Sequence, residues 1–169
     1  IYPGVREWHR TIRTALSKEG RTLTNCFGRR RKFLDRWGHD LHKVAYSYIP
    51  QSTVGELMNQ RGVVYLYTHQ DLFSDAQFLN TIHDSLQYQL PLHIGETRII
   101  KTIKALKENL EKPLTWKDRT FSIPVDTEIG FSFNKDKMLK WKAKKVNNTS
   151  EEELSRELAE YVSTAGRVD

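Results

Sequence analysis

The stretch Phe78-Leu79-Asn80-Thr81-Ile82-His83-Asp84-Ser85-Leu86-Gln87-Tyr88-Gln89-Leu90 decides the fold. Apolar and aromatic side chains, which favour strands, flank a polar centre on both sides. Asp and Ser tolerate turn geometry and bond to their own backbone, so residues 83–85 predict a tight turn between two antiparallel strands. We expect the carboxylate of Asp84 at the tip of this hairpin.

Upstream of this hairpin, the first segment predicts an amphipathic helix and then a basic hairpin. Pro3 suits the first turn of a helix, apolar residues recur at helical spacing, and Gly20 is a natural stop. The other face of this helix carries three arginines, for which solvation and contact with a partner stay equally open: Arg6, Arg10 and Arg13. Residues 21–26 and 30–34 then predict two short strands joined by a turn.

The segment before the His-Asp turn predicts two helices separated by Pro50. Residues 40–49 have helical character, and proline breaks a helix because it lacks an amide donor and clashes with the preceding turn. A second helix is expected from Gln51 or Ser52. Its far end stays open, since residues 54–58 have helical spacing whereas residues 63–67 have the side chains of a strand.

The segment after the turn predicts a long helix, a strand and a helical tail. Residues 96–112 form the helix, which stops before a proline. Residues 121–133 alternate as a strand interrupted by Pro124, and a short helix is expected around residues 135–141. A polar linker then leads to a surface helix at residues 151–162. Helices and short antiparallel strands in this order predict an α+β fold.

The composition bounds the class of protein. With 169 residues and 38% apolar side chains, the chain is long enough for one domain with a core. It has no apolar run of membrane-spanning length and does not begin like a signal peptide, so we expect an intracellular protein with no membrane partner, in the cytoplasm or, for a virus, the host cytoplasm. Cys26 is the single cysteine, which excludes an internal disulfide. The first residue is not Met, which suggests a processed product or a piece of something larger.

The positive charge is local. Residues 1–45 hold eleven Lys and Arg against four Asp and Glu, whereas the rest of the chain holds sixteen against seventeen. Clustered positive charge of this kind commonly meets phosphate backbones, and as often it is only solvated surface. Charge alone therefore leaves the partner open.

Five segments follow one another between residues 2 and 130. They are Tyr2-Pro3-Gly4-Val5, Thr24-Asn25-Cys26-Phe27-Gly28-Arg29-Arg30-Arg31, Pro50-Gln51-Ser52-Thr53, Ile82-His83-Asp84-Ser85 and Pro124-Val125-Asp126-Thr127-Glu128-Ile129-Gly130. In this order they resemble the part of A-family DNA polymerases, the DNA polymerase I type, that follows the nucleotide-binding helix of the fingers. The third segment departs from the family pattern, with Ser52 where Gly is common and one residue fewer between Pro50 and Gln51.

The resemblance implies a polymerase palm-like fold, an antiparallel hairpin and strands packed with helices, incomplete without an N-terminal partner. Residues 1–20 would be a helix from the fingers/palm junction, and residues 21–141 would be a palm segment with the basic hairpin and the His-Asp turn. Residues 142–169 would be a linker and a C-terminal surface helix. The implied function is that of the C-terminal palm portion or small subunit of a DNA-directed DNA polymerase.

The resemblance also implies roles for single residues. Asp84 would bind a catalytic metal, and His83 would approach the primer terminus. Gln51 would hydrogen-bond in the DNA minor groove, and Lys43 would contact DNA. The basic hairpin would contact phosphates through Arg29, Arg30 and Arg31, of which strand alternation would place at most two on one side. Taken alone, the same residues also fit local turn hydrogen bonds, a helix cap and solvated surface.

Nucleotidyl transfer by two Mg²⁺ ions needs paired carboxylates. Ser85 stands where the family usually has Glu, and a neutral hydroxyl is a poorer ligand for a hard cation. The family's other metal carboxylate and the fingers residues that bind the dNTP have no counterpart in this chain. We therefore expect an N-terminal partner to supply both, with primer–template DNA as the shared substrate.

Two other functions stay open. A palm that has lost catalysis would be a non-catalytic DNA-binding or processivity module, which Ser85 favours. A basic protein-interaction domain with an accidental resemblance is the third class. On the first interpretation, Asp84 is half of an active site whose other half lies outside this chain.

Overall fold

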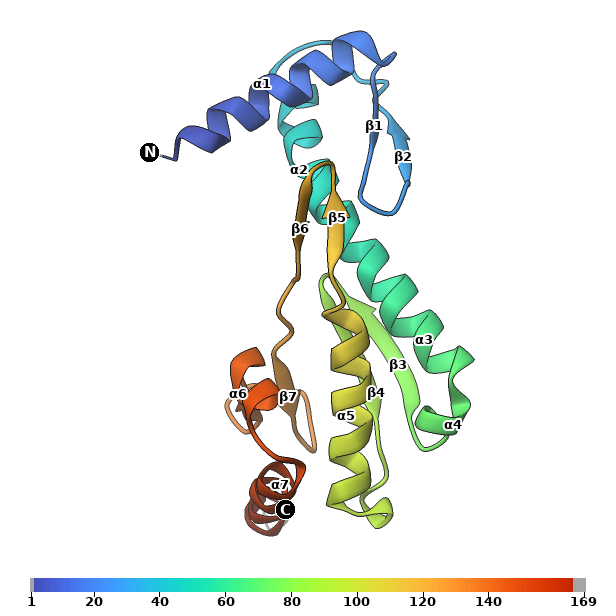
Figure 1. Cartoon of the computed structure of the whole chain (residues 1–169), viewed down its shortest axis with the longest axis vertical. Helices are drawn as coiled ribbons and strands as arrows, with labels where there is room; N and C mark the ends of the chain where they lie inside the picture. Colours follow the sequence, from blue (N-terminus) through green and yellow to red (C-terminus); the bar gives the residue numbers. More distant parts are fainter. Residues whose placement is uncertain (1, 166–169) are drawn as a thin grey trace. The chain divides into compact units, whose positions relative to one another are not determined.

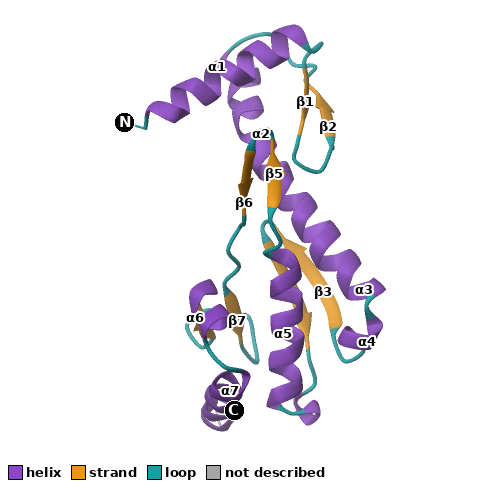
Figure 2. Ribbon diagram, viewed as in Figure 1, coloured by secondary structure: helices purple, strands orange, loops and turns teal. Residues whose placement is uncertain are grey.

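The computed structural model describes residues 2–165, which belong to two compact units. Of these, residues 2–57 and 114–119 form the first unit, and residues 58–113 and 120–165 form the second. Both combine helices with small antiparallel strand pairs, which confirms the predicted α+β class (Figures 1 and 2). Within residues 2–165, none of the helices has the length and apolar character that crossing a membrane requires.

The first unit packs two helices against a hairpin. Helix α1 (Pro3–Lys18) and the strands β1 (Thr22–Thr24) and β2 (Arg30–Lys32) confirm the predicted helix and basic hairpin. Helix α2 (His39–Leu57) covers the hairpin, and Trp116 of strand β5 (Leu114–Trp116) packs against the same core. The core residues are Ile12, Leu16, Leu23, Phe33, Leu41, Ala45, Tyr48 and Ile49.

The predicted break at Pro50 is wrong, because helix α2 runs through this residue. Proline cannot donate a hydrogen bond to the carbonyl of Tyr46, four residues earlier, and a freed buried carbonyl is costly. The indole Nε1 of Trp8 donates to that carbonyl at 3.0 Å. A side chain of helix α1 thus replaces the missing helical bond, and the helix continues to Leu57.

The second unit begins with helical turns and the central hairpin. A π-helical turn (Met58–Val63) leads into α3 (Val64–Thr68) and α4 (Gln70–Phe73), so residues 63–67 are helical rather than a strand. The strands β3 (Gln77–Ile82) and β4 (Ser85–Gln89) pair antiparallel with Ile82 opposite Ser85. The predicted hairpin around the His-Asp turn is confirmed.

The rest of the second unit differs from the prediction in its strands. A 3₁₀ turn (Leu92–Ile94) precedes helix α5 (Glu96–Leu110), as predicted, but residues 121–133 are not one strand. Strand β6 (Arg119–Phe121) ends where that strand should begin, and β7 (Thr127–Ile129) pairs with β8 (Leu139–Trp141). The helix expected around residues 135–141 is wrong, because Leu139 and Trp141 alternate with an exposed lysine, which is the period of a strand.

The tail joins the core of the second unit. Helices α6 (Ala143–Asn148) and α7 (Glu151–Ala165) bury apolar side chains against α5. The core residues of this cluster are Ile99, Ile100, Ile103, Trp141, Val146, Leu154 and Leu158. The outer face of α7 remains exposed, as expected for a surface helix.

Candidate nucleic-acid and metal site

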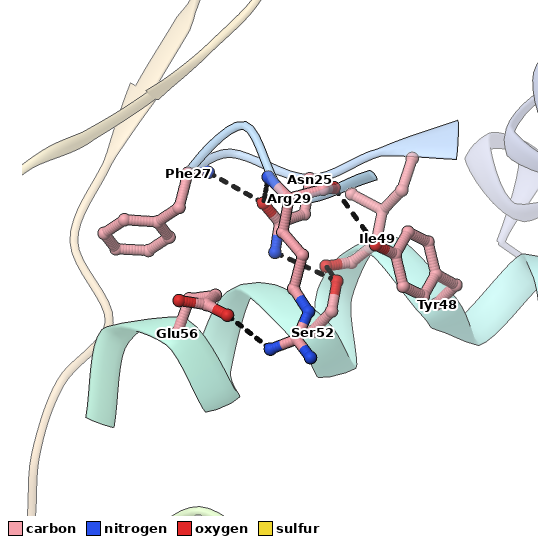
Figure 3. Close-up of polar contacts among 7 residues, drawn as sticks. All are labelled: Asn25, Phe27, Arg29, Tyr48, Ile49, Ser52 and Glu56. Carbon is pink, nitrogen blue, oxygen red and sulfur yellow. Dashed lines mark hydrogen bonds and ion pairs between the residues drawn. The ribbon is translucent and has the colours of Figure 1, made fainter. Parts of the chain in front are cut away.

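The turn between β1 and β2 is organised by Asn25, which is 2% exposed. Its side-chain oxygen accepts hydrogen bonds from the backbone amides of Phe27 at 3.0 Å and Arg29 at 2.9 Å. Gly28 adopts a φ of +83°, which a residue without Cβ reaches freely. The side chain of Asn25 therefore replaces backbone partners that a turn of this shape cannot supply (Figure 3).

The same turn is fastened to helix α2. The side-chain Nδ2 of Asn25 donates to Ser52 Oγ at 3.1 Å. The hydroxyl of Tyr48 donates to the backbone carbonyl of Arg29 at 3.0 Å. The amide of Cys26 donates to Thr53 Oγ1 at 3.4 Å. Tyr48, Ser52 and Thr53 of α2 thus hold the turn that presents the arginines, and Figure 3 shows the first two of these contacts.

The three arginines have different surroundings. Arg29 forms an ion pair of 2.5 Å with Glu56, whose side chain is only 12% exposed, so Arg29 braces the turn against α2. The guanidinium of Arg31 lies 4.9 Å from the ring centroid of Phe33 and 5.9 Å from that of Tyr48, as in cation–π contacts. Arg30 is exposed, and its backbone pairs with Thr24.

All three arginines line one hollow of about 480 Å³ on the first unit. Arg29 precedes β2, so strand alternation applies only to Arg30 and Arg31. Gln51 lines the same hollow from α2, together with Val44, Ser47, Tyr48 and Ser52. Lys43 is exposed outside this lining, on the same row of α2 as Ser47 and Gln51, since residues four apart share a helix face.

The β3–β4 turn presents His83 and Asp84 to solvent. Both side chains are exposed, and His83 has a φ of +54°, a left-handed conformation that non-glycine residues seldom adopt. Ser85 Oγ donates to the carbonyl of Ile82 at 2.9 Å and closes the turn. The hydroxyl of Ser85 thus has a structural partner, whereas the carboxylate of Asp84 is open to solvent.

Strand β4 of this hairpin packs through apolar side chains against the π-helical turn. A Cβ on Gly62 would lie 3.3 Å from Leu86 Cδ2 and 3.6 Å from Leu110 Cδ2. Asn109 Nδ2 donates to the carbonyl of Arg61 at 2.7 Å, which satisfies a backbone group in that widened turn. Because Gly62 has no side chain, Leu86 of β4 can approach the π-helical turn closely. Leu86 follows Asp84 by two residues.

In the described part of the chain, Asp84 does not lie in a group of possible metal ligands. Among residues 2–165, no three His, Cys, Asp or Glu side chains gather where they could hold a metal ion. Mg²⁺ prefers several oxygen ligands with near-ideal octahedral geometry. Within residues 2–165, a metal ion at Asp84 would therefore have a single carboxylate as its protein ligand.

Compared with known proteins, the chain matches no family model, no curated protein and no solved structure.

The structural partners of the site are not evident from sequence motifs. Glu56 and Gly62 carry no motif, but Asn25 three residues before Gly28 is a turn signal that identifies Asn25 as an organising residue.

Proposed function

We propose that the chain is the C-terminal palm portion or small subunit of a DNA-directed DNA polymerase. It would supply Asp84 as one metal-binding carboxylate and primer–template contacts through Gln51, Lys43 and the arginines of the β1–β2 hairpin. The observation that carries the proposal is the exposed His83-Asp84 pair at the tip of a hairpin, within five ordered segments that resemble A-family polymerases.

The geometry of the tip supports this role. An exposed carboxylate on a two-residue turn can reach a metal that another chain segment also ligates. Backbone outliers cluster at functional sites, and His83 is one of the three non-glycine residues with positive φ in residues 2–165. When bound there, Mg²⁺ would stabilise negative charge during phosphoryl transfer.

The hollow on the first unit supports the DNA contacts. Guanidinium groups bind phosphate oxygens through paired donors, and Arg30 and Arg31 are exposed beside Gln51. An amide donor fits the minor groove, where A·T and T·A pairs present the same acceptors, so such a contact tests pair shape more than sequence. Arg29 would act through its ion pair with Glu56, by holding the turn that carries its two neighbours.

Primer extension by the chain together with the part carrying the other carboxylate tests the proposal. Asp84→Asn should abolish synthesis while primer–template affinity stays unchanged, because the amide keeps the shape and removes the charge. Ser85→Ala is the matched control on the same turn and should retain most of the activity. Undiminished synthesis by Asp84→Asn would refute the proposal.

A second candidate function is a non-catalytic DNA-binding or processivity module. It is favoured by Ser85, whose hydroxyl closes the turn where the polymerase pattern has a second carboxylate. This candidate predicts salt-dependent DNA binding by the chain alone that survives Asp84→Asn, with no loss of synthesis in the complex.

A further inference from the structure

The loop between β7 and β8 exposes two aromatic side chains. Phe131 is 53% exposed and Phe133 is 66% exposed. Two exposed phenylalanines two residues apart form a local apolar surface, and contiguous apolar surfaces often mark interaction sites. This loop belongs to the second unit and lies in a part of the chain outside the proposed metal and DNA contacts.

The loop is held in a defined shape. The ring of Phe131 stacks on that of Tyr161 with centroids 6.1 Å apart and an interplanar angle of 19°. The hydroxyl of Tyr161 donates to the carbonyl of Lys137 at 2.7 Å, and the amide of Lys137 donates to the carbonyl of Asn134 at 2.9 Å. Helix α7 thus fixes both sides of the loop, so the aromatic surface is formed before any partner binds.

The same segment is strongly basic. Residues 135–145 contain six lysines and one aspartate, all exposed, although residues 46–169 as a whole are slightly acidic. Lys142 pairs with Asp126 at 2.7 Å and Lys145 pairs with Glu157 at 2.6 Å. Four further lysines have no carboxylate within salt-bridge distance among residues 2–165: Lys135, Lys137, Lys140 and Lys144.

Nearby acidic groups do not cancel this charge. Three exposed carboxylates lie close: Asp136 within the loop, Glu128 just before it and opposite Lys140 in the β7–β8 pairing, and Glu160 beside Tyr161. The acidic start of α7, residues 151–153, precedes Tyr161 by eight to ten residues, which is about 12 to 15 Å along a helix. That exceeds the screening length of about 10 Å at 0.1 M salt, so the four lysines outweigh the three nearby carboxylates and a net positive charge remains.

We propose that Phe131, Phe133 and the four lysines bind single-stranded DNA, with bases stacked on the rings and phosphates near the ammonium groups. Aromatic faces beside mobile cations are how proteins bind unpaired strands without sequence preference. Bases in a duplex are covered by their neighbours, so an exposed ring selects an unstacked strand. This site rests on neither Asp84 nor the arginine hollow.

Fluorescence anisotropy with two labelled 15-mers tests the proposal on the full chain. One is oligo(dT), and the other carries the same phosphates with abasic sugars. The background is Arg30→Gln/Arg31→Gln, which removes the phosphate contacts of the first unit. We expect oligo(dT) to bind about tenfold more tightly than the abasic strand, as base stacking on an aromatic side chain implies.

Two variants and one control separate stacking from charge. Phe133→Leu should remove most of the preference for oligo(dT), because leucine keeps the apolar surface without a ring face. Phe121→Leu, at a residue 41% exposed and outside the loop, should leave the preference unchanged. Changing the four lysines to glutamine should reduce the salt slope by about 0.7 for each phosphate that no longer has an ammonium partner.

Three outcomes would overturn the proposal. They are equal affinity for the two strands, a preference that Phe133→Leu leaves intact, and equally tight binding of an acidic peptide, which would assign the surface to a protein partner. Because the measurement involves no synthesis, its failure leaves the proposed polymerase role untouched, and the failure of that role leaves this site standing.

Discussion

The two units anchor their candidate functional hairpins differently. In the first unit the polar hub is Asn25, inside the turn that presents the arginines. In the second unit the polar hub is Glu111, which binds Lys107, the amide of Val125 and Asn147, remote in sequence from the His-Asp turn. The arginine turn is therefore fixed by hydrogen bonds within the turn and to α2, whereas the β3–β4 hairpin packs through apolar contacts at Gly62 and leaves the side chains of His83 and Asp84 exposed.

The largest effect is expected at Glu111. Its partner Lys107 has a side chain that is 3% exposed, and a buried ammonium without its carboxylate is strongly destabilising. Glu111→Gln should lower the free energy of unfolding by about 3 kcal/mol, because an amide accepts hydrogen bonds but carries no charge. Glu108→Gln, on the exposed face of the same helix, should cost less than about 0.5 kcal/mol. Urea denaturation of both variants measures the difference.

The same carboxylate makes stability depend on pH. Burial alone would raise the pKa of Glu111 from its ordinary 4.5, but hydrogen bonds from Lys107, Val125 and Asn147 together lower it. A pKa lowered in the folded state gives stability that is present above pH 4.5 and disappears as the pH falls through the lower folded value. Stability of the wild type should fall more steeply below pH 4.5 than that of Glu111→Gln. Equal slopes would contradict the role of Glu111.

The next largest effect is expected at Asn25. Asn25→Ala leaves the amides of Phe27 and Arg29 without their acceptor, and it should cost about 2 kcal/mol. Hydrogen exchange of these two amides should accelerate. Ser85→Ala, which removes one exposed turn bond from the other hairpin, should cost about 0.5 kcal/mol. If the two variants lose similar free energies of unfolding, side-chain hydrogen bonds stabilise both hairpin turns equally, and the proposed difference between them is wrong.

Apolar packing below the His-Asp tip is tested at Gly62. Gly62→Leu forces a side chain against Leu86 and Leu110 and should cost about 1.5 kcal/mol, as overpacked cores do. Gly55→Leu is the matched control, because nothing lies within 4 Å of a Cβ there, and a better helix former should stabilise α2 by about 0.8 kcal/mol. A harmless Gly62→Leu would mean that β4 is not held by close approach.

The helices and hairpins whose formation depends on neighbouring residues were predicted from the sequence. The hairpin of residues 77–89 and the helix Glu96–Leu110 follow from side-chain periodicity, and the exposed tip at Asp84 follows from turn chemistry. The long-range partners of the polar hubs could not be predicted, because they lie far along the chain. Ser52 is 27 residues from Asn25, and Asn147 is 36 residues from Glu111. Such pairings depend on tertiary structure and leave no sequence spacing to interpret.

Strand β8 escapes prediction for a different reason. Its two apolar residues stand in a lysine-rich segment, where charge obscures a period of two. The sequence also does not predict the ion pair between Arg29 and Glu56, which makes Arg29 one of the residues that stabilise the turn. The sequence identifies the residue types of the site but not which of them are engaged by the fold.

The smallest effect concerns the helix that carries Gln51. Trp8→Phe removes the indole donor to the Tyr46 carbonyl and should cost about 1 kcal/mol. In a Pro50→Ala background the restored backbone amide can donate to the same carbonyl, so Trp8→Phe should cost less there by at least about 0.5 kcal/mol. A double-mutant cycle by urea denaturation measures this coupling. Additive costs would show that Trp8 acts on α2 through packing alone, and that Pro50 is tolerated without a substitute donor.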